Sequence, residues 1–355
     1  MTYQPKSLDI LTVPPPTFSV GEVATHVLDQ YGLAGEFTGL VSERDQNFRL
    51  SCDDGRCYVV KIANSGEPEV ITDFQIQALL HIEKHGCAVA VPRIIRTIDG
   101  SVSTTLLAQG LAHVVRVATF VPGRPLGDCD NNADLARKLG ICLAETDAAL
   151  CGFEHPGDSP ALIWDMQRAS DLRNLVELMS DAELRATVSN CLDDFEQNAL
   201  PQFVALRSQI IHNDLNPGNV LVADDEPPSV AGVIDFGDML RAPLIIDVAI
   251  AASYMRSTDE DALELLAPFV AGFNEITPLD QIEFELLYDL VRTRLVTTIV
   301  LMNWRMSARP ASDAYMKKGL LNERSSEGFL ERLNSLSRAQ FNKSVVSALN
   351  NREKQ

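Results

Sequence analysis

The sequence lacks the cysteine pattern of a crosslinked or zinc-binding protein, and it lacks a long apolar run. Its seven cysteines are an odd total without a Cys-x-x-Cys pair, which argues against a disulfide framework or a zinc site. The best candidate for a membrane span, residues 243–255, is short and contains Asp247. The N-terminus has no basic segment followed by an apolar one, so we expect no signal peptide. These absences predict a cytoplasmic protein with no membrane attachment.

Positive charge is also scarce. Thirty Lys and Arg face 49 Asp and Glu, for a net charge of −19, which argues against binding nucleic acid or anionic lipid. Nine basic and thirteen acidic residues give residues 1–118 a net charge of −4, which leaves −15 for the remainder. The acidic second part would attract a cationic small molecule, or it simply carries solvated carboxylates on its helices.

Length and residue patterning predict two lobes of different composition. A chain of 355 residues exceeds one ordinary domain. Residues 1–20 contain three consecutive prolines and predict an extended arm. The region up to residue 120 predicts a β-rich lobe with strands at 37–41, 47–52, 57–62, 101–107 and 113–119 and helices at 20–31 and 67–85. A Val-Pro-Gly-Arg-Pro break at 121–125 marks the boundary.

Residues 121–355 predict a larger, mostly helical lobe. The patterns favour helices at 132–150, 161–179, 181–197 and 245–255, followed by three more after Asp259. One strand-like segment, residues 209–238, interrupts them. We therefore expect the α+β class, with a small β-rich lobe joined to a helical one.

The strand-like segment carries the residues of chemical interest. Residues 212–219 read His-x-Asp-x-x-x-x-Asn, and Asp-Phe-Gly follows at 235–237. Phosphoryl transfer to an alcohol needs a carboxylate that accepts the hydroxyl proton, and oxygen ligands that hold Mg²⁺ on the nucleotide phosphates. Asp214 fits the first role, and Asn219 with Asp235 fits the second. We expect these side chains to converge in the fold.

This spacing resembles the catalytic and metal-binding segments of the protein-kinase-like fold, and more closely the aminoglycoside phosphotransferase and choline kinase group. The strings Val-Ile-Asp-Phe-Gly-Asp (233–238) and Ser-Glu-Arg-Asp-Gln-Asn-Phe (42–48) are most similar to hydroxylysine kinase and its bacterial relatives. The resemblance spans roughly residues 39–252. It implies a bilobal kinase that binds ATP or GTP and Mg²⁺ between its lobes and an acceptor on the helical lobe.

The resemblance also implies roles for residues of the N-terminal lobe. Lys61, on the third strand, would contact the nucleotide phosphates. The position that would supply its glutamate partner carries Gln75, so the lysine pairs either with Asp73 or with a neutral amide. Thr119 and Val121 would offer backbone groups to the purine.

The first hairpin has no Gly-x-Gly-x-x-Gly sequence. The polar turn from Ser42 to Asn47 would cover the phosphates, or it is an ordinary solvated turn. Arg44 would contact a phosphate or pair with a surface acid.

Four further residues near the motif have expected roles, and two of them have alternatives. His212 would act as a base or, as the resemblance favours, orient the loop through hydrogen bonds. Asp238 would bind a second metal or an ammonium group, or cap the next turn. Asp247 would hold loop backbone. Asn213 stands where regulated protein kinases usually carry an arginine, which argues against a protein substrate.

The resulting hypothesis is a small-molecule kinase that phosphorylates the hydroxyl of a small cationic amino alcohol similar to hydroxylysine. Homoserine, choline, ethanolamine and aminoglycosides are alternative acceptors. A catalytically silent nucleotide-binding scaffold is the alternative from another functional class, and the unusual Gln75 is its support. The sequence does not specify the oligomeric state.

Overall fold

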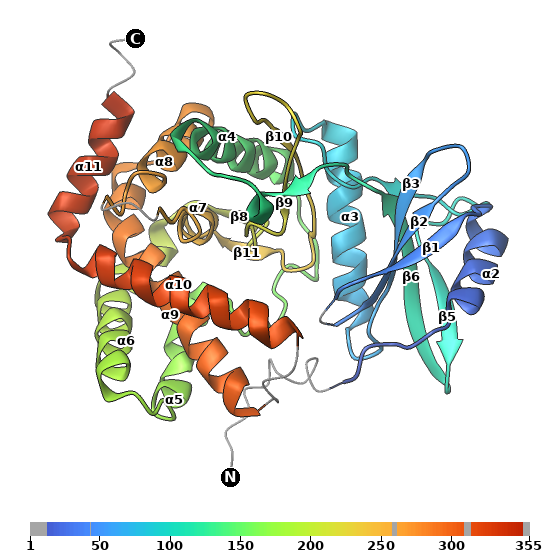
Figure 1. The fold of residues 1–355 in the computed structure, drawn as a ribbon, viewed down its shortest axis with the longest axis horizontal. Helices are drawn as coiled ribbons and strands as arrows, with labels where there is room; N and C mark the ends of the chain where they lie inside the picture. The colour runs from blue at the N-terminus through green and yellow to red at the C-terminus, as the bar shows by residue number, and fades with distance from the viewer. Residues whose placement is uncertain (1–12, 43, 258–260, 309–313, 351–355) are drawn as a thin grey trace.

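The computed structural model describes residues 13–42, 44–257, 261–308 and 314–350. Two parts lie side by side in Figure 1, a twisted sheet with two helices and a larger group of helices. We call residues 13–119 the sheet region and the rest the helical region. The α+β class expected from the sequence is confirmed. Most of the expected N-terminal arm, residues 1–12, lies outside the described residues.

The sheet region is built on antiparallel strands in the order β1-β2-β3-β6-β4, with β5 also pairing with β6. Its elements are α2 (Val20–Tyr31), β1 (Glu36–Leu40), β2 (Gln46–Ser51), β3 (Cys57–Ile62), α3 (Glu69–His85), β4 (Ile94–Ile95), β5 (Thr104–Ala108) and β6 (Leu111–Thr119). Helix α2 covers the outer side of the sheet, and α3 stands between the sheet and the helical region (Figure 1).

Strand β3 shows how the sheet positions a charged side chain. Tyr58, Val60 and Ile62 are buried in one apolar cluster with residues of α2, whereas the alternate positions are less buried. Successive side chains of a strand point to opposite faces, so Lys61 projects from the face opposite α2. The expected position of Lys61 on the third strand is confirmed.

The helical region begins with short elements and continues with longer helices. It comprises β7 (Arg124–Pro125), the 3₁₀ segment Leu126–Asp128, α4 (Ala133–Leu150), the 3₁₀ segment Met166–Leu172, α5 (Arg173–Val176), α6 (Ala182–Asp194), a π turn Phe195–Ala199, the 3₁₀ segment Leu200–Ala205, α7 (Leu244–Ala252), α8 (Leu266–Ile276), α9 (Gln281–Ala308), α10 (Ala314–Asn334) and α11 (Arg338–Asn350). Two small sheets, β10-β9-β7 and β11-β8, carry the strand-like segment. Their strands are β8 (Ser208–Ile211), β9 (Val220–Val222), β10 (Val230–Val233) and β11 (Leu240–Pro243).

Two expectations for the helical region are wrong. The helix predicted at 161–179 is instead a 3₁₀ segment and one α-helical turn, because Asp165 accepts the amide of Gln167 (2.9 Å) and Arg168 is non-helical. Such local side-chain hydrogen bonds compete with helical ones. After residue 260 the described part of the chain contains four helices instead of three.

Helices α4 and α8 pack with their backbones in close contact. A side-chain carbon on Gly140 would overlap the carbonyl oxygen of Phe269, and one on Gly272 would overlap that of Arg137. Each glycine therefore leaves space for the backbone of the opposite helix. This contact connects the core under the small sheets to the C-terminal helices.

Gly140→Ala should lower the free energy of unfolding by at least 1–3 kcal/mol, the approximate cost of overpacking. The measurement is chemical denaturation at neutral pH. Gly328→Ala, on α10, is the matched control, because nothing lies within 4 Å of the added carbon and alanine favours the helix. Equal stability of the two variants would contradict the close contact.

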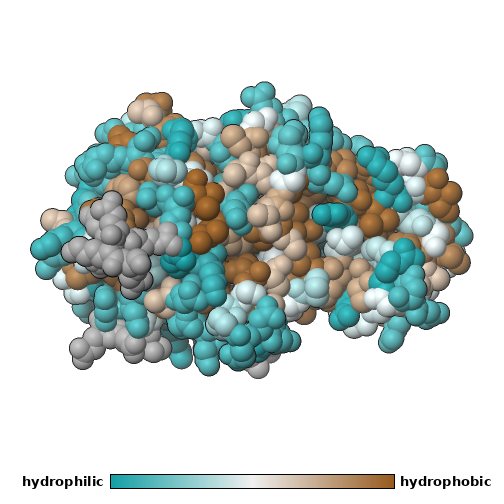
Figure 2. All heavy atoms as spheres, turned by 90° about the horizontal axis from the view of Figure 1, so that it is seen from above, coloured by the Kyte–Doolittle hydropathy of each residue, from teal (hydrophilic) through white to brown (hydrophobic). Residues whose placement is uncertain are grey.

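The surface carries both hydrophilic and hydrophobic residues. Figure 2 shows one face on which hydrophilic residues predominate toward both ends and hydrophobic residues gather over the middle. Within the described residues, the helices are all too short or too polar to cross a membrane.

Candidate active site

The two small sheets bring the motif residues together. The loop with Asp214 and Asn219 connects β8 to β9, and Asp235 follows β10. Strand β10 pairs with β9, and β11 pairs with β8. The loop between β8 and β9 and the segment that follows β10 therefore lie next to each other. The amide of Ile234 donates to the carbonyl of Asn219 (2.9 Å), which joins the segments directly.

Asp214 is held by two asparagines of its own loop. Asn216 and Asn219 each donate an amide hydrogen to its Oδ2 at 2.9 Å, and Asn219 also reaches the Asp214 carbonyl at 2.9 Å. These bonds use the amide nitrogen of Asn219, so its amide oxygen is the atom able to ligate a cation. The side chain of Asp214 is 21% exposed.

Burial, together with the negative charge of Asp238, raises the pKa of Asp214 to about 7. Arg294, with Nη2 3.7 Å from Oδ1, opposes both effects. A carboxylate that titrates near neutrality can accept a proton from an alcohol more readily than an ordinary aspartate.

Asp235 has the opposite electrostatic environment. Its Oδ1 lies 3.2 Å from Nζ of Lys61, and this positive charge lowers the pKa of Asp235 to about 2. The residue has a positive φ of 63°, and its side chain is about half exposed. Asp235 therefore presents an ionised oxygen ligand at neutral pH.

The donor set fits a Mg²⁺ ion that is held jointly with nucleotide phosphates. The described residues contain no group of three or more His, Cys, Asp and Glu placed to bind a metal alone. Asn219 and Asp235 supply one neutral and one anionic oxygen, and Mg²⁺ commonly takes only one or two carboxylates and completes its shell with phosphate and water.

The structure corrects both suggested partners of Lys61, since that lysine contacts Asp235. Gln75, 4% exposed on α3, instead accepts a hydrogen bond from Arg116 and donates to the carbonyl of Gly237 (3.3 Å). Arg116 lies directly opposite Lys61 in the β3–β6 register. Gln75 thus links the sheet to the loop after Asp235.

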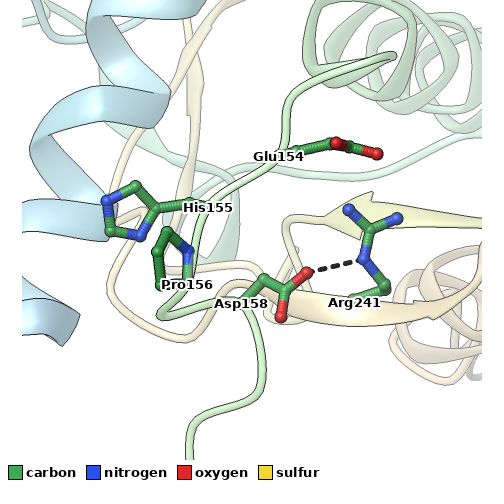
Figure 3. Close-up of a pocket in the computed structure, with 5 residues that line it drawn as sticks. All are labelled: Glu154, His155, Pro156, Asp158 and Arg241. Atoms are coloured by element: carbon green, nitrogen blue, oxygen red, sulfur yellow. Dashed lines mark hydrogen bonds and ion pairs between the residues drawn. The ribbon is translucent and has the colours of Figure 1, made fainter.

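Asp73 contacts His155 at 3.2 Å, and His155 lines a surface pocket of about 460 Å³. In the same pocket Asp158 binds Arg241 of β11 at 2.6 Å (Figure 3). Residues 154–158 therefore connect α3 to β11. The pocket lining includes none of the motif residues.

The first hairpin reaches the motif through Arg44. Its Nη2 binds Asp238 at 2.7 Å, so Arg44 pairs with an acid near Asp214 instead of a surface acid. Asp238 forms this ion pair, which none of its three predicted roles included. The Ser42 hydroxyl accepts the amide of Asp45 (3.2 Å) and closes the turn, in which Glu43 lies outside the described residues.

His212 and Asp247 form the support beneath Asp214. His212 is fully buried; its Nδ1 accepts the amide of Asp214 (3.3 Å), and its Nε2 donates to the carbonyl of Ile234 (3.1 Å). Asp247 accepts the amides of His212 (2.8 Å) and Asn213 (2.9 Å). The predicted loop-holding role of Asp247 is confirmed, and the contacts of His212 are those of an orienting residue.

The segment expected near a purine is tied into the sheet. Thr119 donates its amide to the carbonyl of Arg93 (2.9 Å), and Phe120 donates to that of Cys57 (3.0 Å). Val121 is 6% exposed. A purine contact at Thr119 and Val121 stays a prediction.

Three residues of this area were missed by sequence reasoning. They are Arg116, Asp147 and Arg294. A buried charge within an apolar stretch is the signal that could have identified Arg294, which follows Val291 and precedes Leu295 on α9. Asp147 adjoins Asp247, and burial together with the charge of Asp247 raises its pKa well above the usual carboxyl range.

A model of the phosphotransferase enzyme family matches residues 36–280. The chain belongs to this family. Hydroxylysine kinase from Danio rerio is 26% identical over 326 residues, covering 86% of this chain and 90% of that protein. Hydroxylysine kinase from Mus musculus is 27% identical over 326 residues, covering 85% and 86%. This phosphotransferase therefore acts on hydroxyl groups of small molecules.

Solved structures of the same fold include two kinases of small molecules. Amicoumacin kinase, solved with AMP-PNP, Ca²⁺ and Ami, superposes with a TM-score of 0.67 at 17% identity and covers 91% of this chain and 97% of its own. A microcompartment-associated aminopropanol kinase gives 0.64 at 17% identity, with 88% and 97% covered. The kinase-like fold expected from the sequence is confirmed.

Asp247→Asn should destabilise the phosphotransferase by about 1.5–3 kcal/mol, because one of two charge-assisted hydrogen bonds is lost. Asp147→Asn is the matched control. Burial and the charge of Asp247 raise the pKa of Asp147, which favours its protonated form. A protonated carboxyl can donate to Asp247, and so can the amide of asparagine. Chemical denaturation at pH 7 measures both variants.

Because the folded-state pKa of Asp147 is raised, its contribution favours folding below the usual carboxyl pKa and is lost as pH increases. Asp147→Asn should therefore reduce the loss of stability with increasing pH. Equal destabilisation by the two substitutions would contradict the protonated pair.

Proposed function

We propose that the protein transfers the γ-phosphoryl group of ATP or GTP to the hydroxyl of an amino alcohol similar to hydroxylysine. The single observation that carries this proposal is the convergence of Asp214, Asn219 and Asp235, with Lys61 on Asp235. The names of the curated relatives favour hydroxylysine among the acceptors. Homoserine, choline, ethanolamine and aminoglycosides are the alternatives.

In this proposal Asp214 accepts the proton of the acceptor hydroxyl as the hydroxyl oxygen attacks the γ-phosphorus. The bond from the γ-phosphorus to the β–γ bridging oxygen breaks, and ADP or GDP leaves. Asn219 and Asp235 hold Mg²⁺, which supplies charge neutralisation on the phosphates when it is bound. Lys61 contacts the phosphates. His212 orients the loop, and Arg44 holds Asp238 beside the base.

The N-terminal lobe (1–120) would bind the nucleotide, and the helical lobe (121–355) would bind the acceptor. Ser42 in the first turn, and Thr119 and Val121 at the connection, lie on the nucleotide side. The pairing of β7 with β9 supports the boundary, because the chain has joined the helical region by Arg124. All seven cysteines are free, which supports a reducing, cytoplasmic setting.

Two other functions have less support. A silent scaffold rests on Gln75, but the contacts of Gln75 to Arg116 and Gly237 give it a positioning role. A protein-directed kinase would need a peptide platform after Asp235, and β11 already begins at Leu240.

Asp214→Ala should lower kcat by about 10²–10⁴-fold, the usual contribution of a general base. A coupled assay with ATP or GTP and 5-hydroxylysine, homoserine, ethanolamine, choline and an aminoglycoside measures it. Asp171→Ala, an acid paired with Arg168 on the surface, is the control. Near-normal turnover by Asp214→Ala would refute the assigned base, and nucleotide binding without turnover by the unaltered protein would favour the scaffold.

The plot of kcat/KM against pH should lose activity below about pH 7, because protonated Asp214 cannot accept a proton. Asp238→Asn should move this acidic limb to lower pH, since it removes the negative charge that raises the pKa of Asp214. An unchanged limb would mean that another group controls it.

A further inference from the structure

A buried arginine on α9 lies beside Asp214 with unused hydrogen-bonding capacity. Arg294 is 6% exposed, and its Nη2 is 3.7 Å from Oδ1 of Asp214 and 3.4 Å from the Tyr254 hydroxyl. Its Nε is buried and has no hydrogen-bond partner among the described residues. An unsatisfied buried N–H is costly, so this atom is suited to an incoming acceptor atom.

More positive charge adjoins Arg294. The guanidinium of Arg256 lies 5.2 Å from the ring centre of Tyr254. Arg294 contacts the hydroxyl of the same tyrosine. Burial, together with the charges of Arg294 and Arg332, lowers the pKa of Arg256 to about 10. Nε of Arg256 donates to the carbonyl of Ser253 (2.7 Å), which fixes its guanidinium next to Tyr254 and close to Arg294.

The position of this cluster distinguishes it from the nucleotide side. Lys61 reaches Asp235 from the sheet region and marks the side of the site that is proposed to bind the nucleotide. Arg294 and Arg256 belong to the helical region, to which the proposed function assigns the acceptor, and Arg294 lies beside the proposed base. Under that assignment Arg294 adjoins the acceptor, and not the phosphates held by the metal ligands.

We propose that Arg294, assisted by Arg256, binds a carboxylate of the acceptor, so that the substrate is a hydroxylated amino acid and not a simple amino alcohol. This proposal rests on the proposed function. Arginine presents a planar pair of donors that matches a carboxylate. The expectation of a purely cationic acceptor is revised accordingly, because choline, ethanolamine and aminoglycosides have no carboxylate.

The test compares kcat/KM for 5-hydroxylysine and for its decarboxylated analogue, which keeps the hydroxyl and both amines. The unaltered protein should prefer the amino acid by about 10- to 100-fold, the range for a charge-assisted hydrogen bond. Arg256→Gln should lower kcat/KM for the amino acid more than for the decarboxylated analogue and so reduce this preference. Arg294→Gln should also remove the preference. Because Arg294 contacts Asp214, this variant can in addition change the rate with both substrates.

Arg338→Gln is the matched control, because Arg338 pairs with Asp289 and not with Asp214; it should keep the full preference. Thermal unfolding verifies that each variant is folded, and Arg294→Lys replaces Arg294→Gln if the latter is not. Equal use of both substrates by the unaltered protein would overturn the proposal, as would an equal loss on both substrates in the Arg294 and Arg256 variants. Absence of transfer to either substrate, or to any amino alcohol, would instead refute the proposed function.

Discussion

The contact between Lys61 and Asp235 is the interaction on which the site depends, because it joins a strand of the sheet region to the loop after β10 in the helical region. The two residues are 174 positions apart. This pairing keeps Asp235 ionised. It also gives both the carboxylate of Asp235 and the ammonium group of Lys61 a partner of opposite charge. The proposed Mg²⁺-nucleotide would offer a cation to Asp235 and phosphate oxygens to Lys61, so the two side chains that pair with each other have the charges that such a ligand requires.

The core of the site was predictable because its contacts are local. Asp214, Asn216 and Asn219 bond to one another within six residues, so the loop sequence largely determines its shape. The pattern of residues 57–62 likewise predicted β3, the strand that carries Lys61. Asp247 was predictable because a buried carboxylate near a helix start commonly accepts backbone amides.

The remaining contacts were not predictable because they depend on tertiary packing. Gln75 meets Arg116 on a strand 41 residues away, and no local pattern links them. Asp73 turns to His155 for the same reason. The helix predicted at 161–179 failed differently: its apolar spacing was suitable, but Asp165 and Arg168 interrupt the backbone.

Net charge was the least informative signal for the acceptor. The chain carries −19 overall, yet a buried arginine, Arg294, lies beside Asp214. Exposed charges are screened beyond about 8–10 Å in physiological salt, whereas buried charges are screened much less. One buried arginine beside Asp214 therefore acts on a ligand there more strongly than a distant surface acid does. Recognition at this site is determined by the few charges that are removed from water, and a count over the whole sequence cannot identify them.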